Sequence, residues 1–343
     1  MKILITGGAG YIGSHVAKQI LEKTKDELVI LDNLSTGSEK TLKSLEKIRN
    51  FEFIKLDLSE FSKVKEFIKK YNFDAIIHFA ASIVVPESVE NPIKYYMNNT
   101  VNTSSLIKYA DEFKVKKFIF SSTAAVYGEP NEVPKEGINE DFIKKPINPY
   151  GQSKLMSEQI LQDVSKASKN LKFVIFRYFN VAGADAFYKD NTLSPRIGQS
   201  FPNATHLIKI ASECAVNARE KMYIFGDSYN TEDGTCVRDY IHVDDLSTAH
   251  IQALEYLESS PSDIFNIGYA RGFSVKEVIQ EVKKISKNDF KVELSNPRAG
   301  DPAFLIANNT KIKEKMSWVP KHDSLEEICK SALVWEEVLK SEK

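Results

Sequence analysis

A tyrosine and a lysine separated by four positions are the side chains of this sequence best suited to acid–base chemistry. Tyr150 and Lys154 follow Asn148 and Pro149, and proline is well placed in the first turn of a helix. Four residues is close to one helical turn, so the phenol and the ammonium are expected on one face. A phenol with a pKa of about 10 is a poor base at neutral pH, but a neighbouring ammonium lowers that pKa. The alternative is a surface tyrosine packed over a lysine stem.

Hydroxyl groups at the end of an apolar run could complete such a site. Ser121, Ser122 and Thr123 follow the apolar residues from position 117 onward. They are expected at the carboxyl end of a buried strand, where they could donate hydrogen bonds to a substrate. Their alternative role is to cap the next turn.

A glycine-rich loop near the start of the chain has the spacing of a dinucleotide-binding turn. Gly7, Gly10 and Gly13 surround Tyr11 and Ile12, directly after the apolar residues 2–6. Glycines permit the tight turn and let backbone N–H groups approach a pyrophosphate, and the following helix adds the positive end of its dipole. By itself the spacing could be a simple strand-to-helix turn. A positive nicotinamide ring bound nearby would further favour a tyrosine phenolate.

An acidic residue follows the loop at the distance that nucleotide binding requires. Asp32 ends the second apolar run, about 20 residues after the glycines, where a carboxylate can accept hydrogen bonds from ribose hydroxyls. The same charge would repel the extra phosphate of NADP, so NAD is the expected cofactor. Alternatively, Asp32 and Asn33 cap the following turn. Further residues expected at this edge are Asp57, Leu58, Phe79, Ala80 and Ala81.

The elements that must position these residues alternate as strands and helices. Near-continuous apolar runs predict buried parallel strands at 2–6, 28–31, 52–55, 75–79, 117–121 and 172–176. Helical spacing covers 11–23, 60–70, 91–112 and 149–166, and later 206–218, 243–257 and 325–339, with further strands at 222–225 and 264–268. The prediction is an α/β protein, a Rossmann-like doubly wound parallel sheet with a smaller α/β substrate-binding lobe.

The expected domains are a Rossmann domain over 1–180 and a substrate lobe over 181–343. Residues 236–268 are expected to return in part to the first sheet. No element is expected between Asn180 and Pro202, a stretch rich in Gly, Asp and Asn. Long irregular segments of this kind are often functional.

Composition excludes several classes of protein. The chain has 343 residues with a formal net charge of -1, so a dominant nucleic-acid-binding surface is not expected. Cys214, Cys236 and Cys329 have neither zinc-site nor disulfide spacing, and no run approaches the ~18 apolar residues of a membrane span. No signal peptide is evident, so the expected location is the cytoplasm, with no membrane partner.

Together these motifs resemble the extended short-chain dehydrogenase/reductase family, and within it the UDP-glucose 4-epimerases. The matching segments are TGGAGYIGSH (6–15), DNL (32–34), FIFSS (118–122), PYG (149–151), SKLM (153–156), RYFN (177–180), DGT (233–235), VRDYIHV (237–243) and RAGDP (298–302). The resemblance covers nearly the whole chain. It implies an isomerase of nucleotide-sugar and galactose metabolism that inverts carbon 4 of a UDP-hexose through a 4-keto intermediate and bound NAD.

The resemblance also implies residue roles. Tyr150 would take the proton of the 4-hydroxyl, Thr123 would hydrogen-bond the 4-oxygen, and Lys154 would also bind the nicotinamide ribose. Asn98, Ser121 and Tyr178 would contact the cofactor. The substrate side would comprise Asn180 at the diphosphate, Arg238 and Arg298 at the phosphates, Asp301 at the uridine ribose, and His206, Leu207, Tyr223 and Phe225 around phosphate and uracil. Taken singly, Arg298 and Asp301 could equally form ordinary surface ion pairs.

Three positions depart from the family pattern. Thr123 stands where many members have serine, and its hydroxyl is retained on a stiffer side chain. Ile83 replaces a lysine, which leaves the pyrophosphate charge mainly to the helix N-terminus. Leu305 occupies the position that gates the sugar pocket and is intermediate in size. We therefore hypothesise that both plain and N-acetylated UDP-hexoses are accepted.

Two alternative functions would require different residues at this site. A dehydratase or decarboxylase could use the same scaffold, but Ala124 and Ala125 follow Thr123 where family dehydratases have an Asp-Glu pair. A non-catalytic NAD-binding regulator would commonly lack the tyrosine or the lysine.

Residues 242–245 (HVDD) could suggest a metal site, although a helix start explains the two acids better, and no metal is expected. The resemblance implies a homodimer formed through the helices at 91–112 and 149–166.

Overall fold

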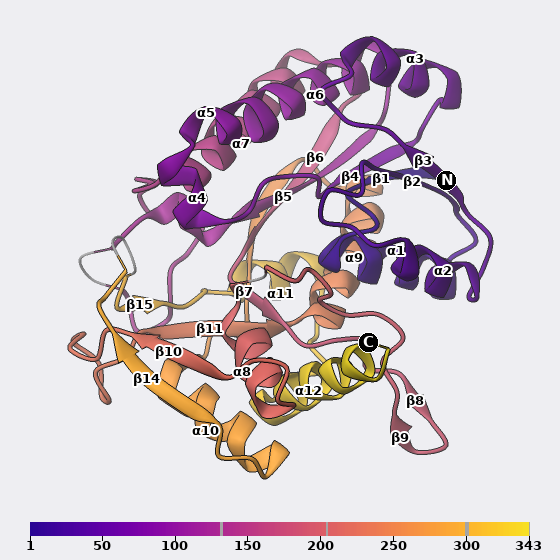
Figure 1. Cartoon of the computed structure of the whole chain (residues 1–343). Helices are drawn as coiled ribbons and strands as arrows, with labels where there is room; N and C mark the ends of the chain where they lie inside the picture. Colours follow the sequence, from indigo (N-terminus) through magenta and orange to yellow (C-terminus); the bar gives the residue numbers. More distant parts are fainter. Residues whose placement is uncertain (131–132, 204, 299–301, 343) are drawn as a thin grey trace. The chain divides into compact units, whose positions relative to one another are not determined.

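A seven-stranded sheet is the largest sheet among the described residues of the computed structural model, which are 1–130, 133–203, 205–298 and 302–342 (Figure 1). Its order is β12-β6-β5-β4-β1-β2-β3, from Asp263–Ile267, Lys172–Tyr178, Lys117–Thr123, Ala75–His78, Lys2–Thr6, Glu27–Asp32 and Glu52–Lys55. The pairs from β6 to β3 are all parallel. The strand order reverses between β1 and β4, where such sheets bind ligands at their carboxyl ends. The predicted fold class is confirmed.

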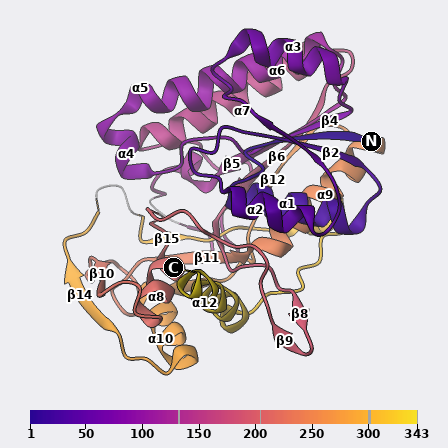
Figure 2. The same cartoon turned by 45° about the vertical axis from the view of Figure 1, so that its right-hand side comes forward.

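Helices cover both faces of this sheet. Figures 1 and 2 show α3, α6 and α7 on one face and α1, α2 and α9 on the other. The bounds are α1 Tyr11–Lys23, α2 Glu39–Glu46, α3 Phe61–Tyr71, α4 Val85–Glu90, α5 Pro92–Tyr95, α6 Asn102–Glu112, α7 Pro149–Ala167 and α9 Val243–Ser259. Burial on both faces explains why the strands are apolar throughout rather than alternating.

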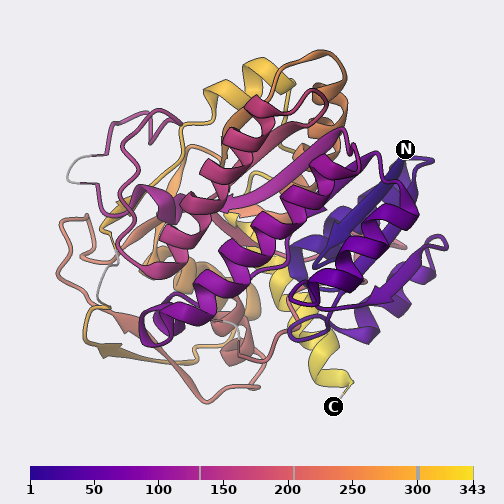
Figure 3. The same cartoon turned by 90° about the horizontal axis from the view of Figure 1, so that it is seen from above.

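The helical segment expected at 91–112 is not a regular α-helix. A π-helical segment, η1 (Tyr96–Val101), separates α5 from α6. Figure 3 shows this purple segment running beside the magenta α7. Such wide turns occur frequently at functional sites. A short 3-10 turn, η2 (Ala124–Tyr127), follows β5.

The chain divides into two compact units. The first comprises Met1–Gly128, Asp141–Tyr178 and Ser247–Phe265, and the second comprises Glu129–Glu140, Phe179–Leu246 and Asn266–Lys343. The chain therefore passes from one unit to the other five times. In the first unit, α7 contacts both η1 and the end of β5 through η2.

The described residues of the second unit form small sheets and further helices. β7 (Asn180–Ala182), β13 (Gly272–Ser274) and β15 (Phe304–Leu305) all pair with β11 (Val237–His242), while β10 (Lys221–Phe225) pairs with β14 (Lys291–Ser295). The remaining elements are the β8–β9 hairpin (Tyr188–Lys189 and Thr192–Leu193), α8 Leu207–Ala215, α10 Val275–Ser286, α11 Thr310–Met316 and α12 Leu325–Ser341.

The expectation of no element between Asn180 and Pro202 is wrong. β7 lies in that stretch and pairs in parallel with β11, with Asn180 opposite Tyr240. A three-residue strand whose partner is distant in sequence leaves no local periodicity to detect. No helix was predicted at 275–286 either, although Ser274 and Glu277 form a full capping box there.

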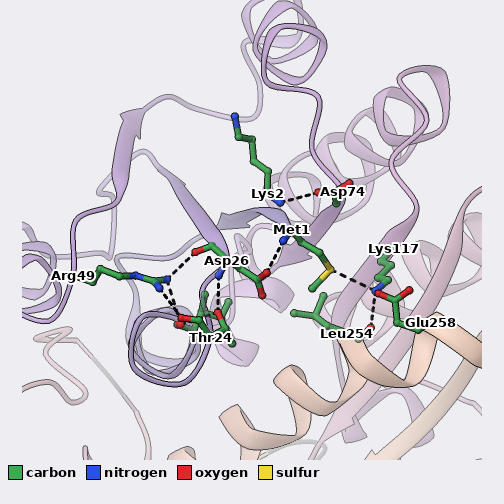
Figure 4. A network of polar contacts seen from close by, with 10 residues as sticks. Met1, Lys2, Thr24, Asp26, Arg49, Asp74, Lys117, Leu254 and Glu258 are labelled. Carbon is green, nitrogen blue, oxygen red and sulfur yellow. Dashed lines mark hydrogen bonds and ion pairs between the residues drawn. The ribbon is translucent and has the colours of Figure 1, made fainter.

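Polar side chains secure the edge of the first sheet opposite the ligand-binding edge (Figure 4). The Arg49 guanidinium donates to the carbonyl oxygens of Thr24 (2.6 Å) and Asp26 (2.7 Å), near the C-terminal end of α1. The buried Lys117 ammonium donates to the carbonyl of Leu254 (2.8 Å) and pairs with Glu258. The Arg49 contacts hold the segment between α1 and β2, and the Lys117 contacts join the start of β5 to α9. Among the described residues, no helix is both long and apolar enough to cross a membrane.

Candidate active site

The backbone around the glycine loop packs so tightly that no side chain would fit at Gly7 or Gly13. Gly7 has a φ of +73°, and a Cβ atom there would lie 2.7 Å from the backbone nitrogen of Ala80. A Cβ atom on Gly13 would lie 2.3 Å from the carbonyl oxygen of Gly7. Gly10 precedes the first turn of α1 and has no side chain that could cap it. The loop therefore presents backbone N–H groups at a helix N-terminus, beside the end of β4, as binding of a pyrophosphate requires.

Asp32 is buried beside this loop. Its carboxylate accepts the backbone N–H of Ala9 (3.0 Å) and of Leu34 (2.8 Å). Burial raises the pKa of Asp32, and the two N–H bonds oppose that shift. The bond from Leu34 is the turn-capping interaction considered as the alternative. Because a carboxylate offers about four lone-pair sites, capping leaves acceptor capacity for a ribose.

The residues expected beside Asp32 form a second hydrogen-bonded group. The Asn33 side chain donates to Asp57 (2.6 Å), and Asp57 also accepts the backbone N–H of Ser59 (2.8 Å). Burial alone would raise the pKa of Asp57, but the bonds from Ser59 and Asn33 lower it. Leu58, which follows, is buried.

The segment after β4 is held by the π-helical segment η1. Phe79 and Ala80 approach Gly7, and Ala81 leads into Ser82. The Asn98 side chain donates to the Ser82 hydroxyl (3.0 Å). Asn99, which was not predicted, both accepts the backbone N–H of Ser82 (2.8 Å) and donates to its carbonyl (2.9 Å).

Tyr150 and Thr123 meet at the carboxyl edge of the sheet. A hydrogen bond joins the Tyr150 phenol to the Thr123 hydroxyl. Thr123 also accepts the backbone N–H of Ala125 (3.1 Å), so the hydroxyl caps η2 as well. Burial raises the pKa of Tyr150, and the Thr123 bond only partly lowers it. The expectation that the Lys154 ammonium, together with a bound nicotinamide ring, lowers this pKa stays a prediction.

Lys154 lies one turn further along α7, and its side chain is buried. The ammonium donates to the backbone carbonyl of Ser121 (2.7 Å) and lies over the ring of Phe120, 4.9 Å from its centroid. Burial lowers the pKa of Lys154 to about 7, and the charge of Glu158 opposes that shift. Ser121 itself donates through its hydroxyl to the carbonyl of His78 (2.8 Å).

Tyr178 completes this group from the neighbouring strand. It is the register partner of Thr123 in the β5–β6 pair. Its hydroxyl is 2.6 Å from Nε2 of His250, and burial raises its pKa well above the ordinary value. The structure therefore brings Thr123, Tyr150, Lys154, Ser121 and Tyr178 together within the first unit.

The residues predicted for the substrate side that the structure describes all lie in the second unit. Arg238 and Leu305 are register partners in the β11–β15 pair. The Arg298 guanidinium lies 3.8 Å from the ring centroid of Phe225, and Tyr223 is near Phe225 on β10. His206 and Leu207 are at the start of α8, and Asn180 begins β7. Asp301 lies outside the described residues.

Sequence reasoning missed three buried charged groups. Glu158 on α7 and Arg177 on β6 form a fully buried ion pair (2.7 Å) next to the Tyr150 group. Asp239, adjacent to Arg238, accepts the backbone N–H groups of Tyr269 (2.8 Å), Ala270 (2.9 Å) and Ala307 (3.2 Å). Burial raises the pKa of Asp239 to about 7.

Signals for all three groups were present in the sequence, since Asp239 is part of the matched segment at 237–243. Glu158 lies one helical turn after Lys154, and Arg177 is part of the matched segment at 177–180. Within the described part of the chain, no three His, Cys, Asp or Glu side chains are grouped to hold a metal ion.

Comparisons with known proteins agree with this geometry. Residues 3–268 match the sequence model of the NAD dependent epimerase/dehydratase family. The chain belongs to this family. It is 44% identical over 339 residues to the UDP-glucose 4-epimerase of Azospirillum brasilense, covering 98% of this chain and 92% of that one.

Solved structures extend the match to the fold. The UDP-Glc/GlcNAc 4-epimerase of Campylobacter jejuni is 56% identical with a TM-score of 0.84, covering 98% and 99% of the two chains. The UDP-glucose 4-epimerase of Bifidobacterium longum, solved with NAD+ and UDP, is 33% identical with a TM-score of 0.91, covering 98% of each chain. The predicted resemblance, the prediction of an NAD-dependent epimerase and the prediction of NAD as cofactor are confirmed.

Proposed function

We propose that this epimerase inverts the configuration at carbon 4 of a UDP-hexose, with Tyr150 as its acid–base residue. The observation that supports this proposal most directly is the Tyr150–Thr123 hydrogen bond at the ligand-binding edge of the sheet. A phenol held there by a hydroxyl can accept the proton of a sugar hydroxyl and return it.

The residues of the first unit fit NAD. The Gly7–Gly13 loop and the N-terminus of α1 would hold the pyrophosphate, Asp32 a ribose, and Lys154 the ribose of the nicotinamide. Asn33, Asp57, Leu58, Asn98 and Tyr178 are proposed as further cofactor contacts. When bound, NAD supplies a hydride acceptor that takes hydride from carbon 4 and gives it back.

The chain's own groups perform the proton steps. Tyr150 removes the proton of the 4-hydroxyl as the carbonyl forms, and Thr123 donates a hydrogen bond to the same oxygen. The 4-keto sugar turns over while its UDP stays anchored, so that reduction occurs on the opposite face and Tyr150 returns the proton. Because burial raises the pKa of Tyr150, the positive charge of Lys154 and of the cofactor must stabilise the phenolate.

Residues of the second unit are proposed to anchor the UDP group. Arg238 and Arg298 present guanidinium groups, which suit phosphate oxygens. Further proposed contacts are Asn180, His206, Leu207, Tyr223, Phe225 and Asp301. The experiment that tests this function mixes purified protein with UDP-galactose and measures UDP-glucose, and absence of conversion would refute it.

A stable 4-keto-6-deoxy product would instead indicate a dehydratase. Ala124 and Ala125 form η2 directly after Thr123 and supply no acid for eliminating water.

The sugar range is proposed to include N-acetylated substrates. Leu305 is buried in β15, opposite Arg238. Its side chain is smaller than a tyrosine, which leaves room for an acetamido group at carbon 2. The Campylobacter jejuni relative is described as acting on both UDP-Glc and UDP-GlcNAc. Turnover of UDP-N-acetylglucosamine tests this proposal, and no detectable product would defeat it.

A homodimer through the predicted helices is supported by their exposed apolar side chains. On these helices Ile93, Met97 and Met156 have relative exposures of 68%, 52% and 39%, and Val89 on the neighbouring α4 has 63%. Exposed apolar groups on neighbouring helices can form an interface. Light scattering on purified protein tests the dimer, and a monomer at micromolar concentration would count against it. Cytoplasmic location stays a prediction.

A further inference from the structure

Three consecutive residues of β5 are each bonded to a different turn of α7. The Ser121 carbonyl accepts the Lys154 ammonium (2.7 Å), the Ser122 hydroxyl donates to Glu158, and Thr123 bonds Tyr150. Tyr150, Lys154 and Glu158 are spaced by four residues, so they form one row along α7. The proposed function uses the contacts of Tyr150 and Lys154 and leaves that of Glu158 unexplained.

The Glu158 carboxylate contacts two strands at once. Ser122 and Arg177 are register partners in the β5–β6 pair. The Glu158 carboxylate accepts from Nε (3.1 Å) and Nη2 (2.7 Å) of Arg177 as well as from Ser122. Arg177 also donates to the Tyr127 hydroxyl (2.9 Å), and Glu158 raises the pKa of Arg177. Both charges are almost completely buried.

This anchor lies one residue before the reacting groups on each strand. Thr123 follows Ser122, and Tyr178 follows Arg177. Movement of α7 at Glu158 would therefore change the separation of Tyr150 from Thr123. Displacements of about 1 Å at a catalytic group can cost up to about a hundredfold in rate.

We propose that Glu158 is a positioning residue: its carboxylate fixes α7 to Ser122 and Arg177 and thereby sets the Tyr150–Thr123 contact. This inference rests on the proposed function for its effect on turnover. The geometry is reinforced by charge, since Glu158 favours the ammonium form of Lys154. The other titratable groups around Lys154 are Tyr150 on α7 and His78 on β4. Burial lowers the pKa of His78 to about 3, so this histidine is neutral.

Two substitutions test separately how Glu158 positions α7 and what its charge does to Lys154. Ser122→Ala removes one hydroxyl and keeps the Arg177 pair, so the protein should fold. We expect kcat to fall about tenfold while KM and NAD content stay near wild type. Glu158→Gln keeps hydrogen-bonding atoms but removes the charge. The pKa of Lys154 should then fall further, so the basic limb of the kcat–pH profile should move to lower pH, and Glu158→Asp should restore its position.

A matched control is available in the second unit. Glu336 is also a buried glutamate in an ion pair, with Lys209. Glu336→Gln is expected to lower stability without moving the pH profile. If Ser122→Ala keeps wild-type kcat, or if Glu158→Gln loses only stability as Glu336→Gln does, the positioning role is refuted.

A readout without turnover distinguishes this inference from the proposed function. Ultraviolet difference titration of the holoenzyme, with Tyr150→Phe as the blank, measures the pKa of Tyr150. Ser122→Ala should raise this pKa by up to about one unit as the Thr123 bond weakens, and an unchanged value would refute the role. An inactive wild type with this pKa shift present would count against the proposed function alone.

Discussion

The Lys154 ammonium lies 2.7 Å from the backbone carbonyl oxygen of Ser121. This single contact fixes the cation of α7 to the end of β5, two residues before Thr123. It also helps to retain a charge where burial disfavours one. The cost of that burial is visible as a pKa of about 7 for a group whose ordinary value is 10.5.

The buried Lys154 makes stability depend on pH. Its folded pKa is lowered, so the unfolded chain binds one more proton than the folded protein between about pH 7 and 10.5. The stability of the wild type relative to Lys154→Met should therefore rise as pH increases across that range. Urea unfolding of both proteins at several pH values measures this difference. A difference that is constant with pH, or that falls, would contradict the burial argument.

Removing the Asp32 charge should weaken NAD binding and relax discrimination against NADP. Asp32→Asn loses a charged acceptor, which corresponds to about 1.5–3 kcal/mol, or roughly ten- to a hundredfold in Kd. The side-chain amide of the variant also has one acceptor oxygen instead of two for the backbone N–H groups of Ala9 and Leu34. Calorimetric titration with both dinucleotides checks this prediction, and an unaltered NAD affinity would rule out the ribose contact.

Enlarging the side chain at Leu305 should narrow the sugar range. Leu305→Tyr places a bulky ring at a buried position opposite Arg238. We expect kcat/KM for UDP-N-acetylglucosamine to fall at least tenfold, the scale of steric discrimination in a pocket, while UDP-galactose is little affected. Equal losses for both substrates would show that Leu305 does not gate the sugar.

Arg49 should contribute measurably to the stability of the first unit. Arg49→Ala leaves the carbonyl groups of Thr24 and Asp26 without their charged donor, at an expected cost of about 1–3 kcal/mol in unfolding free energy. Arg219, which forms a more exposed ion pair with Glu213, provides the control. Arg219→Ala should cost about 1 kcal/mol or less. Similar losses in both variants would mean that the Arg49 contacts add nothing beyond a surface pair.

Local pattern predicted the first sheet well because its strands are apolar on both faces and follow one another in βαβ units. Helix α1 begins and ends at the predicted residues, and α7 differs by one residue at its end. β7 and β11 depend on partners far away in the sequence, so no local signal marked them.

In the candidate site, too, the features within one helix could be predicted, whereas the contacts between distant segments could not. The spacing of Tyr150 and Lys154 follows from one helix, and that helix is present. The Glu158–Arg177 pair joins a helix to a strand, and only the folded chain reveals it. The direction of the Tyr150 pKa could not be predicted from sequence, because burial depends on how the edge of the sheet is packed.

The most direct test of Tyr150 as the acid–base residue is the turnover of UDP-galactose by Tyr150→Phe, with the NAD content of the variant determined in the same sample. The substitution removes only the phenol oxygen, so NAD should be retained while kcat falls by about 10²–10⁴-fold, the scale of acid–base catalysis. A Tyr150→Phe enzyme that keeps its cofactor and turns over at the wild-type rate would contradict the assignment of Tyr150 as the acid–base residue.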